Sequence, residues 1–396
     1  MINQTLAPIF VRFFATGLNF ILVILLSNFF SAEDLGKYFI FFSTINLVST
    51  FIAFGCNTFV LREFHLNEDI KNIAFNNVFI NVILFMIIFA SLIFLKIINF
   101  SSFNLSILFG SISLVLFKVF SDYFKAKKQP VLSQFIEFSI LPIIIILCLV
   151  LFSLRIELTL FYSTIIYFFI SFLFLVNVRP EFKLKFSDFY KVRSRFFNLF
   201  LVSLVNTSYG SFPYVIFPYF LSLEQIGIFG IAHKIISISG SIIMALSSTF
   251  NVSFSELFSQ NKINTLNKTF KKSQLISFFY YVIFMSFVII FKDYFSIVFG
   301  QNFDFAYPVL FWMMLIRLIS NYFAMSEHIL NMTQKEKYEL FSSIISIIIC
   351  LIFSSSYGFL VLNNSIVIFG IIYSSMFMLR SLISYLFYYK LIYNNG

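Results

Sequence analysis

Five basic residues stand inside long apolar stretches of the chain, where a charge is costly to keep: Arg317, Lys118, Arg12, Lys234 and Arg380. Ionised groups in hydrocarbon are rare, so each one is a functional candidate. The guanidinium of arginine suits bidentate contact with phosphate, and lysine supplies a compact positive charge. We predict a cationic cavity for an anionic ligand. The alternative, near the end of a stretch, is a long side chain that reaches back to water.

Titratable groups of other types are fewer in these stretches. Asp122, Glu137 and Glu327 could lie on a proton or Na⁺ route, and His233 could titrate near neutrality. The alternatives are local ion pairing and, for His233, a hydrogen-bonded packing role. Asp122 follows Lys118 by four residues on one helical face, so a pair between these two is expected.

These charges must be positioned by membrane-spanning helices. The chain has 60% hydrophobic and only 11% charged residues, with a mean hydropathy of +0.95. Windows of about 20 apolar residues predict about twelve transmembrane helices in an all-α fold. The expected spans are 6–27, 37–61, 74–96, 104–124, 131–152, 157–177, 196–221, 226–254, 273–292, 305–330, 338–357 and 366–389.

The basic residues outside the spans predict the orientation. Loops after even-numbered spans hold 17 Lys and Arg, whereas loops after odd-numbered spans hold 4. By the positive-inside rule, both termini face the cytoplasm. The net charge of +10 then lies mostly at the cytoplasmic rim beside anionic lipid headgroups, and no nucleic-acid partner is implied. The first apolar stretch lacks a basic leader and a cleavage site, so we expect it to be retained.

A local repeat divides the chain into two halves. Residues 31–38 read Ser-Ala-Glu-Asp-Leu-Gly-Lys-Tyr, and residues 222–229 read Ser-Leu-Glu-Gln-Ile-Gly-Ile-Phe. In each, the serine can cap a helix, the acid suits its first turn, and the glycine allows close helix approach. We predict parallel six-helix lobes at 1–178 and 196–396, joined by a basic cytoplasmic linker at 179–195.

Helix breakers and cysteines complete the pattern. Gly210, Pro213 and Pro218 interrupt span 196–221, which predicts a hinge, with a static kink as the alternative. Pro142 should kink span 131–152 in the same way. The three cysteines, Cys56, Cys148 and Cys350, lie in apolar runs without metal-site spacing, and we expect them to be small buried residues.

The pattern resembles the Wzx-type O-antigen flippases of the polysaccharide-biosynthesis family, in the MOP exporter superfamily. The resemblance is carried by Arg-Phe-Phe-Ala-Thr-Gly-Leu-Asn at 12–19, by 31–38, by Gly-Cys-Asn-Thr at 55–58, by Leu-Arg-Glu at 61–63 and by Leu-Asn-Met-Thr-Gln-Lys at 330–335. It implies a MOP/MATE-like fold in a bacterial inner membrane. It also implies alternating-access transport of undecaprenyl-diphosphate-linked oligosaccharide to the periplasmic leaflet, alongside a polysaccharide polymerase and a chain-length regulator. The deep cations would then bind diphosphate and sugar.

Two other functions remain open at this stage. An O-antigen polymerase has similar hydropathy, but such enzymes resemble one another in large basic periplasmic loops, which are short and poor in Lys and Arg here. A MATE-like multidrug exporter would favour a carboxylate-rich cavity. We find no catalytic constellation, phosphate loop or cofactor motif, so a non-enzymatic transporter without cofactor or metal is predicted.

Overall fold

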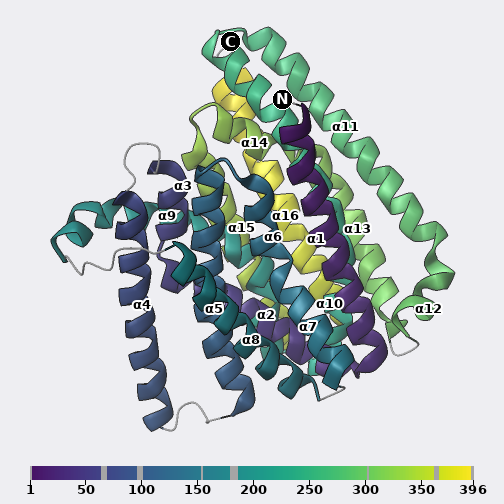
Figure 1. Ribbon diagram of the computed structural model, residues 1–396. Coiled ribbons are helices and arrows are strands. Elements are labelled where there is room, and N and C mark those ends of the chain that lie inside the picture. Colours follow the sequence, from purple (N-terminus) through teal and green to yellow (C-terminus); the bar gives the residue numbers. More distant parts are fainter. Residues whose placement is uncertain are drawn as a thin grey trace. The chain divides into compact units, whose positions relative to one another are not determined.

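The computed structural model describes residues 2–63, 69–95, 101–152, 155–178, 186–300, 303–360 and 365–393, which are helical nearly throughout (Figure 1). In this described part, ten helices are long and apolar enough to cross a membrane, and the bent pair α6 and α7 makes an eleventh. The predicted all-α membrane fold is confirmed. The span predicted at 226–254 falls within α10, some of whose side chains lie outside the described residues.

Most helices begin and end close to the predicted spans, because each span is a continuous apolar run, but α9 and α11 each begin ten residues before the predicted start. The first half of the chain forms α1 (Ile2–Phe29), α2 (Ala32–Ala53), α3 (Cys56–Glu63), α4 (Asp69–Phe94), α5 (Ser102–Ala126), α6 (Pro130–Phe138), α7 (Ile140–Phe152) and α8 (Ile156–Val178). The second half forms α9 (Phe186–Ile216), η1 (Phe217–Tyr219), α10 (Leu223–Ser259), α11 (Ile263–Ile290), η2 (Lys292–Tyr294), α12 (Phe295–Phe299), α13 (Ala306–Phe323), α14 (Met325–Met332), α15 (Glu336–Leu360), α16 (Ile366–Tyr388) and a π-helical turn (Tyr389–Tyr393).

Three predicted spans are each broken into two helices. The first break separates α2 from α3 at Phe54 and Gly55, which both have positive φ angles, 45° and 79°. A Cβ at Gly55 would lie 2.6 Å from the carbonyl oxygen of Phe196 on α9, so glycine allows that close approach. The others separate α13 from α14 at Ala324 and bend α6 against α7 by 43°. Hydropathy alone does not reveal such breaks, since the apolar run continues through them.

The bend between α6 and α7 has an identifiable cause. In a straight helix the N–H of residue 142 would donate to the carbonyl of residue 138, but Pro142 has no N–H. Asn19 of α1 supplies the missing donor. Its Nδ2 donates to the Phe138 carbonyl at 3.1 Å and to the carbonyl of Ala15, on the same helix as Asn19, at 2.9 Å. The predicted kink is confirmed, and Asn19 of the 12–19 motif stabilises it.

Contacts divide the chain into two units. Unit 1 comprises Met1–Leu26 and Tyr38–Val215, and unit 2 comprises Ser27–Lys37 and Ile216–Gly396. By these contacts α9 belongs with unit 1, whereas the predicted lobes place residues 196–221 in the second half. Residues 179–185 of the predicted linker lie outside the described part, and its remainder starts α9. The lobe boundaries stay a prediction.

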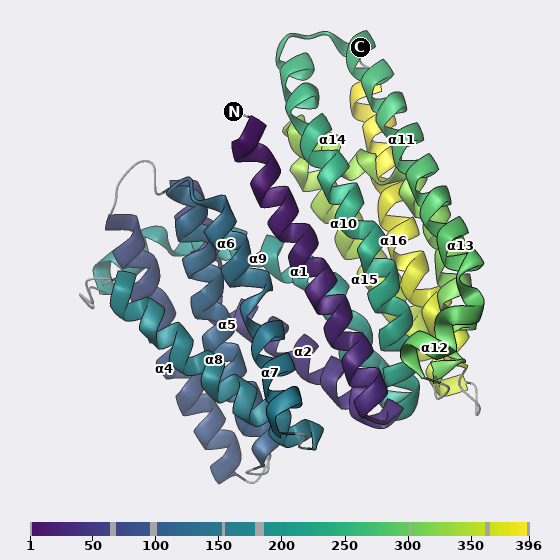
Figure 2. The same cartoon turned by 45° about the vertical axis from the view of Figure 1, so that its right-hand side comes forward.

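Unit 1 is organised around α5. Helices α3, α6 and α8 pack against it, and both views show α8 beside it (Figure 2). Phe117 of α5 stacks on Tyr167 of α8 with ring centroids 4.5 Å apart. The three small groups Ser106, Gly110 and Ser113 are buried on α5, and small residues let neighbouring helices approach in a membrane. This packing fixes the part of α5 that carries Lys118 and Asp122.

Unit 2 is organised around α16, which packs against α13 and α15. Gly370 of α16 faces Val309 and Met313 of α13, where an added Cβ would lie 3.0 and 3.1 Å from their side chains. A buried cluster is formed by residues of α10, α11, α14 and α16, toward the side predicted to be cytoplasmic. Its members are Phe254, Leu266, Phe270, Met325, Ile329, Leu330 and Tyr388.

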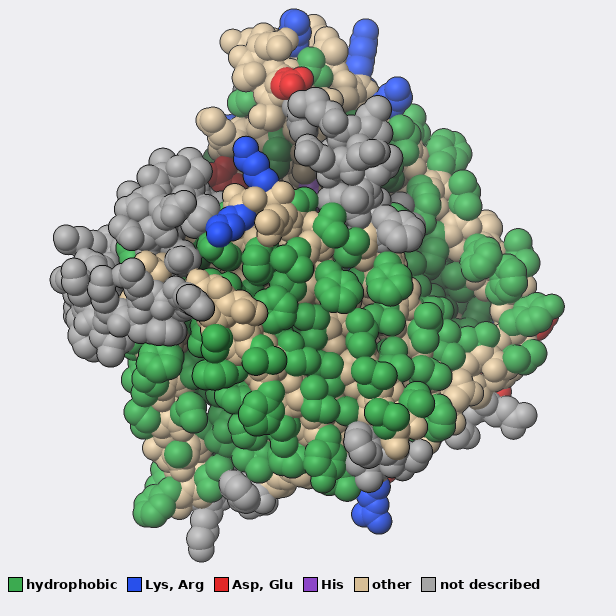
Figure 3. Space-filling view, viewed as in Figure 1, with side chains coloured by type: hydrophobic (Ala, Val, Ile, Leu, Met, Phe, Trp, Pro, Cys, Tyr) green, Lys and Arg blue, Asp and Glu red, His purple; other side chains and the backbone are tan. Residues whose placement is uncertain are grey.

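The outer surface agrees with a lipid environment. Hydrophobic side chains cover most of the visible face, and Lys and Arg show mainly near its upper edge (Figure 3). Large apolar side chains on several long helices are exposed, among them Ile87 of α4, Leu173 of α8 and Ile283 of α11. In water such a surface would aggregate, whereas hydrocarbon solvates it.

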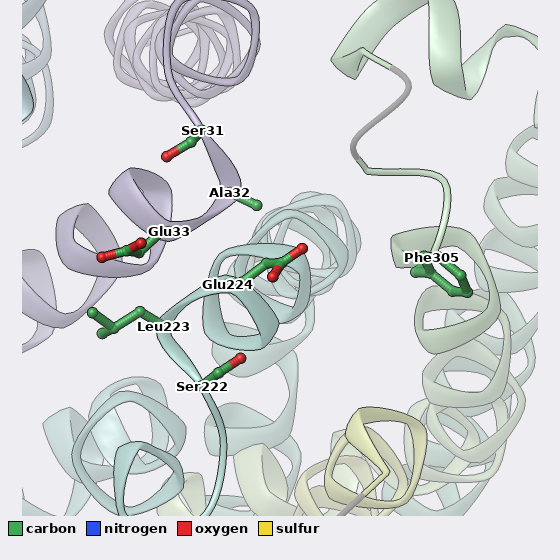
Figure 4. Close-up of a pocket in the computed structure, with 7 residues that line it drawn as sticks. All are labelled: Ser31, Ala32, Glu33, Ser222, Leu223, Glu224 and Phe305. Atoms are coloured by element: carbon green, nitrogen blue, oxygen red, sulfur yellow. The ribbon is translucent and has the colours of Figure 1, made fainter.

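The repeated segments 31–38 and 222–229 meet within unit 2, at the starts of α2 and α10 (Figure 4). A Cβ at Gly36 would overlap the carbonyl oxygen of Leu223, and a Cβ at Gly227 would overlap that of Ala32. Ala32 and Leu223 hold the same place in the two segments, so the contact is reciprocal. The prediction that the glycines allow close helix approach is confirmed.

The predicted caps are also confirmed. The backbone N–H of Asp34 donates to Ser31 Oγ at 3.2 Å, and that of Gln225 donates to Ser222 Oγ at 3.2 Å. Glu33 lies in the first turn of α2 and Glu224 in that of α10, and in Figure 4 their side chains point to opposite sides. Each segment therefore begins with a capped helix start, and the two starts match.

Candidate functional site

The deep carboxylates of unit 1 are held by one lysine. Lys125 Nζ lies 3.0 Å from Asp122 Oδ1 and 3.0 Å from Glu137 Oε2, joining α5 to α6. Asn57 of α3 donates to Asp122 at 3.1 Å, and Ser121 donates to Glu137 at 2.7 Å. We call Asp122, Lys125 and Glu137 the unit 1 clamp. The pair expected between Lys118 and Asp122 does not form, and this prediction was wrong. Asp122 pairs with Lys125, whereas the ammonium of Lys118 donates to hydroxyls of α2.

Unit 2 has a matching arrangement on three helices. Arg380 of α16 pairs with Glu327 of α14 at 3.1 Å and with Glu339 of α15. Ser381 donates to Glu327 at 2.9 Å, and Ser343 donates to Glu339 at 3.0 Å. We call Glu327, Glu339 and Arg380 the unit 2 clamp. The guanidinium of Arg380 is thus paired with two carboxylates. The sequence predicted that Arg380 binds a substrate, and this role is untested.

Lys118 lies one helical turn deeper than the unit 1 clamp and has hydroxyl partners only. Its ammonium donates to Ser49 Oγ at 2.9 Å and to Thr50 Oγ1 at 3.4 Å, both on α2. Those hydroxyls give their own protons to the Asn46 carbonyl, so they present lone pairs to the lysine. In the described part of the chain, Lys118 forms no ion pair, and one of its three N–H donors remains for a ligand.

A small polar pocket adjoins Lys118 in unit 1. Thr50 lies 3.2 Å from Thr207 of α9, and Thr207 lines a pocket of about 380 Å³ between α3 and α9. Thr58, Ser203 and Asn206 also line it. Hydroxyl and amide groups on otherwise apolar helices suit the hydroxyls of a sugar. Sequence reasoning missed these residues; polar positions facing one another across apolar spans were the available signal.

Arg317, on α13 of unit 2, lies on aromatic rings. Its guanidinium carbon is 3.2 Å from the Phe377 ring centroid and 5.8 Å from that of Tyr373. Its buried Nε has no hydrogen-bond partner, and the guanidinium forms no ion pair with any described residue. The rings cover the face of the guanidinium, and the N–H groups at its edge stay available as donors. Arginine binds phosphate through these N–H groups.

His233 and Lys234 of α10 lie in the same unit. His233 Nε2 is 2.8 Å from the hydroxyl of Tyr373, so the histidine contacts the ring on which Arg317 lies. The hydrogen-bonded role is therefore realised, while ion coupling by His233 is untested. Lys234 is half-buried, and among the described residues its ammonium has no hydrogen bond or ion pair.

Arg12 of α1 lies in unit 1. Its guanidinium carbon is 5.7 Å from the ring of Phe138, the residue whose carbonyl accepts from Asn19. The side chain is half-buried. Arg12 and Asn19 of the 12–19 motif therefore both contact the bend in the span formed by α6 and α7.

The remaining predicted positions are placed without a test of their roles. Pro213 lies inside α9, Pro218 lies in η1, and a Cβ at Gly210 would meet nothing within 4 Å. A hinge here stays a prediction. Cys56, Cys148 and Cys350 are buried and free, as predicted. The side chains of 61–63 lie outside the described residues, and the described part shows no group of three His, Cys, Asp or Glu side chains that could hold a metal ion.

The deep charges thus sort into two kinds. All four deep carboxylates named above have a cationic partner, whereas Lys118, Lys234 and Arg317 have no carboxylate partner among the described residues. These three cations are therefore not paired directly, although each clamp has one cation for two carboxylates and carries a net negative charge. A cation without a direct carboxylate partner can bind an anion.

Comparison with solved structures identifies the fold. The chain is similar to an inward-facing multidrug resistance MATE family transporter of the MOP superfamily, with a TM-score of 0.73 and 13% identity over 98% of each chain. It is similar to the lipid II flippase MurJ, with a TM-score of 0.69 and 13% identity over 98% of this chain and 87% of that one.

A third structure comes from Pyrococcus furiosus, a MOP superfamily transporter described by a reverse polarity of its binding pocket. Its TM-score is 0.66 and its identity 12%, over 98% of this chain and 94% of that one. No family model and no curated protein sequence matches the chain. The chain has the MOP-type transporter fold and is a multi-pass membrane protein.

Proposed function

We propose that this chain is a flippase that moves undecaprenyl-diphosphate-linked oligosaccharide repeat units, of the O-antigen type, from the cytoplasmic to the periplasmic leaflet of a bacterial inner membrane. The observation that carries the proposal is that Lys118, Lys234 and Arg317 have no direct carboxylate partner among the described residues. A diphosphate would supply an anionic partner. The likeness to a lipid II flippase supports a lipid-linked cargo.

Candidate binding residues lie in both units. In unit 2, the edge donors of Arg317 contact the diphosphate, and the ring of Phe377 holds the guanidinium in place. In unit 1, Lys118 adds charge beside the polar pocket that includes Asn206 and Thr207, which accepts sugar hydroxyls. Arg12 and Lys234 are further candidates for the cationic lining.

Transport would follow alternating access of two six-helix lobes, 1–178 and 196–396, joined by the linker 179–195. The segment with Gly210, Pro213 and Pro218 would serve as the hinge. Both termini would face the cytoplasm. A polysaccharide polymerase and a chain-length regulator would act on the exported unit. Asp122, Glu137, Glu327 and His233 are the candidates for ion coupling.

Two other functions receive less support. A multidrug exporter for cationic drugs would need unpaired deep carboxylates, whereas those of the described residues are paired. An O-antigen polymerase would be an enzyme, whereas the similar structures are transporters or flippases.

The proposal is tested by deleting the gene in its native host. Loss of surface polysaccharide, with lipid-linked repeat units accumulating on the cytoplasmic leaflet, is the expected result, and the wild-type gene should restore export. Intact surface polysaccharide in a strain with no second flippase would refute the proposal.

A further inference from the structure

A second pocket lies in unit 2, at the end opposite its clamp. The end of α11, η2, α12 and the start of α13 enclose about 540 Å³. Its lining includes Lys292, Asp293, Asp304, Tyr307, Phe311 and Trp312. None of these residues belongs to the proposed transport site.

The pocket carries both positive and negative side chains, which form no ion pair with one another. Lys292 Nζ lies 5.6 Å from the ring centroid of Tyr307, and no described residue forms an ion pair with Lys292, Asp293 or Asp304. All three are exposed at the pocket mouth. One ammonium and two carboxylates without partners are complementary to a ligand that carries an anion and a cation together.

The wall of the pocket is aromatic. Tyr307 and Phe311 stack with centroids 6.5 Å apart, and Phe311 meets Trp312 edge to face at 6.1 Å. Trp312 is 48% exposed and is the single tryptophan of the chain. Tryptophan and tyrosine prefer the headgroup level of a bilayer.

The depth of the pocket follows from its helices. The apolar helix α11 ends at Ile290, just before Lys292, and the apolar helix α13 begins at Ala306, just after Asp304. The charged residues therefore lie immediately outside the hydrocarbon, and Phe311 and Trp312 lie within the first two turns of α13. An aromatic belt alone would not require two carboxylates without partners beside the rings.

We propose that this pocket binds the zwitterionic headgroup of a phospholipid with a primary ammonium, the phosphatidylethanolamine class. Lys292 contacts the phosphate, and Asp293 and Asp304 accept hydrogen bonds from the ammonium. Tyr307, Phe311 and Trp312 contact the glycerol and the first acyl carbons. An anionic headgroup would meet two carboxylates for one lysine, and it binds less well.

Trp312 is a direct reporter, because all tryptophan fluorescence of the chain comes from this residue. The full-length protein is reconstituted in phosphatidylcholine bilayers that contain phosphatidylethanolamine or phosphatidylglycerol brominated near the glycerol end of the acyl chains. At equal mole fraction, we expect phosphatidylethanolamine to quench about twofold or more above brominated phosphatidylglycerol and phosphatidylcholine. K292M and the double variant D293N/D304N should abolish the difference.

K268M, a change at an exposed lysine of α11, is the matched control and should keep the preference. Equal quenching by the three lipids in the wild-type protein would overturn the proposal, as would a preference that survives in K292M and D293N/D304N. A change in Trp312 emission on addition of soluble N,N′-diacetylchitobiose, lost in the same variants, would identify a glycan site and overturn the lipid assignment.

Discussion

The two clamps and the deep cations differ in how a charged side chain is accommodated in the membrane-spanning part of the protein. In each clamp a cation joins two carboxylates from neighbouring helices, and serine hydroxyls complete the hydrogen bonding. Arg317 and Lys234 have no such partners among the described residues, and Lys118 has only hydroxyls. Paired charge fixes helices together, whereas unpaired charge stays ready for a ligand, so removing a cation should have opposite consequences in the two settings.

The largest effect is expected when the unit 2 clamp loses its cation. R380M leaves Glu327 and Glu339 side by side, each less than one-fifth exposed. Removing one partner of a buried ion pair destabilises a protein by about 3 kcal/mol or more. We expect a large drop in the thermal unfolding temperature of the protein in detergent.

The control removes the whole clamp. The triple variant E327Q/E339Q/R380M leaves no unpaired charge and should recover most of the lost stability. If R380M and the triple variant are equally destabilised, the stability of the protein depends on the shape of these side chains and not on their charge pairing.

Replacement of an unpaired cation should spare stability and reduce transport. R317Q removes a charge that has no described ionic partner, so we expect an unfolding temperature equal to or above that of the wild type. Export of surface polysaccharide in the complemented strain should fall about tenfold or more. R317K tests geometry, because lysine keeps the charge but not the planar fork. Unfolding of R317Q would contradict the proposed difference between paired and unpaired cations.

The unit 1 clamp should be the weaker of the two. Lys125 is 30% exposed, against 15% for Arg380, and a lysine offers no planar fork. K125M is expected to destabilise by about 1–2 kcal/mol. Thermal unfolding of K125M and R380M under one set of conditions gives the order, and a larger loss in K125M would reverse this ranking of the clamps.

The smallest effect concerns a pairing without charge. N19L removes the donor that satisfies the Phe138 carbonyl at the bend of α6 and α7. We expect a loss of about 1 kcal/mol, measured by thermal unfolding. N19Q can still donate and should recover part of it. No loss in N19L would mean that another group satisfies this carbonyl.

Much of the fold could be predicted from the sequence, because continuous apolar runs determine where helices cross a membrane. The approach of Gly36 and Gly227 was also predictable, since the same local pattern occurs twice. The breaks at Gly55, Ser139 and Ala324 were not, because hydropathy is continuous there and the partners that stabilise a break, such as Asn19, come from other helices.

The deep charges could be found from the sequence, but their partners could not. Lys118 and Lys125 both lie within four residues of Asp122, and helix geometry alone permits either pair. Lys125 also contacts Glu137 of α6, and Lys118 contacts hydroxyls of α2, and both are tertiary contacts. Arg380 likewise finds its two carboxylates on α14 and α15. That Arg317 has no carboxylate partner among the described residues is visible only once the helices around it are placed.

Equilibrium binding of undecaprenyl diphosphate to the purified protein in detergent, with undecaprenol as the uncharged reference, tests most directly whether the unpaired cations bind the cargo. We expect the wild-type protein to prefer the diphosphate, and R317Q and K118Q each to weaken its binding about tenfold or more while K268Q does not. Equal binding of diphosphate and alcohol, or wild-type affinity in both R317Q and K118Q, would contradict the claim that the unpaired cations bind the cargo.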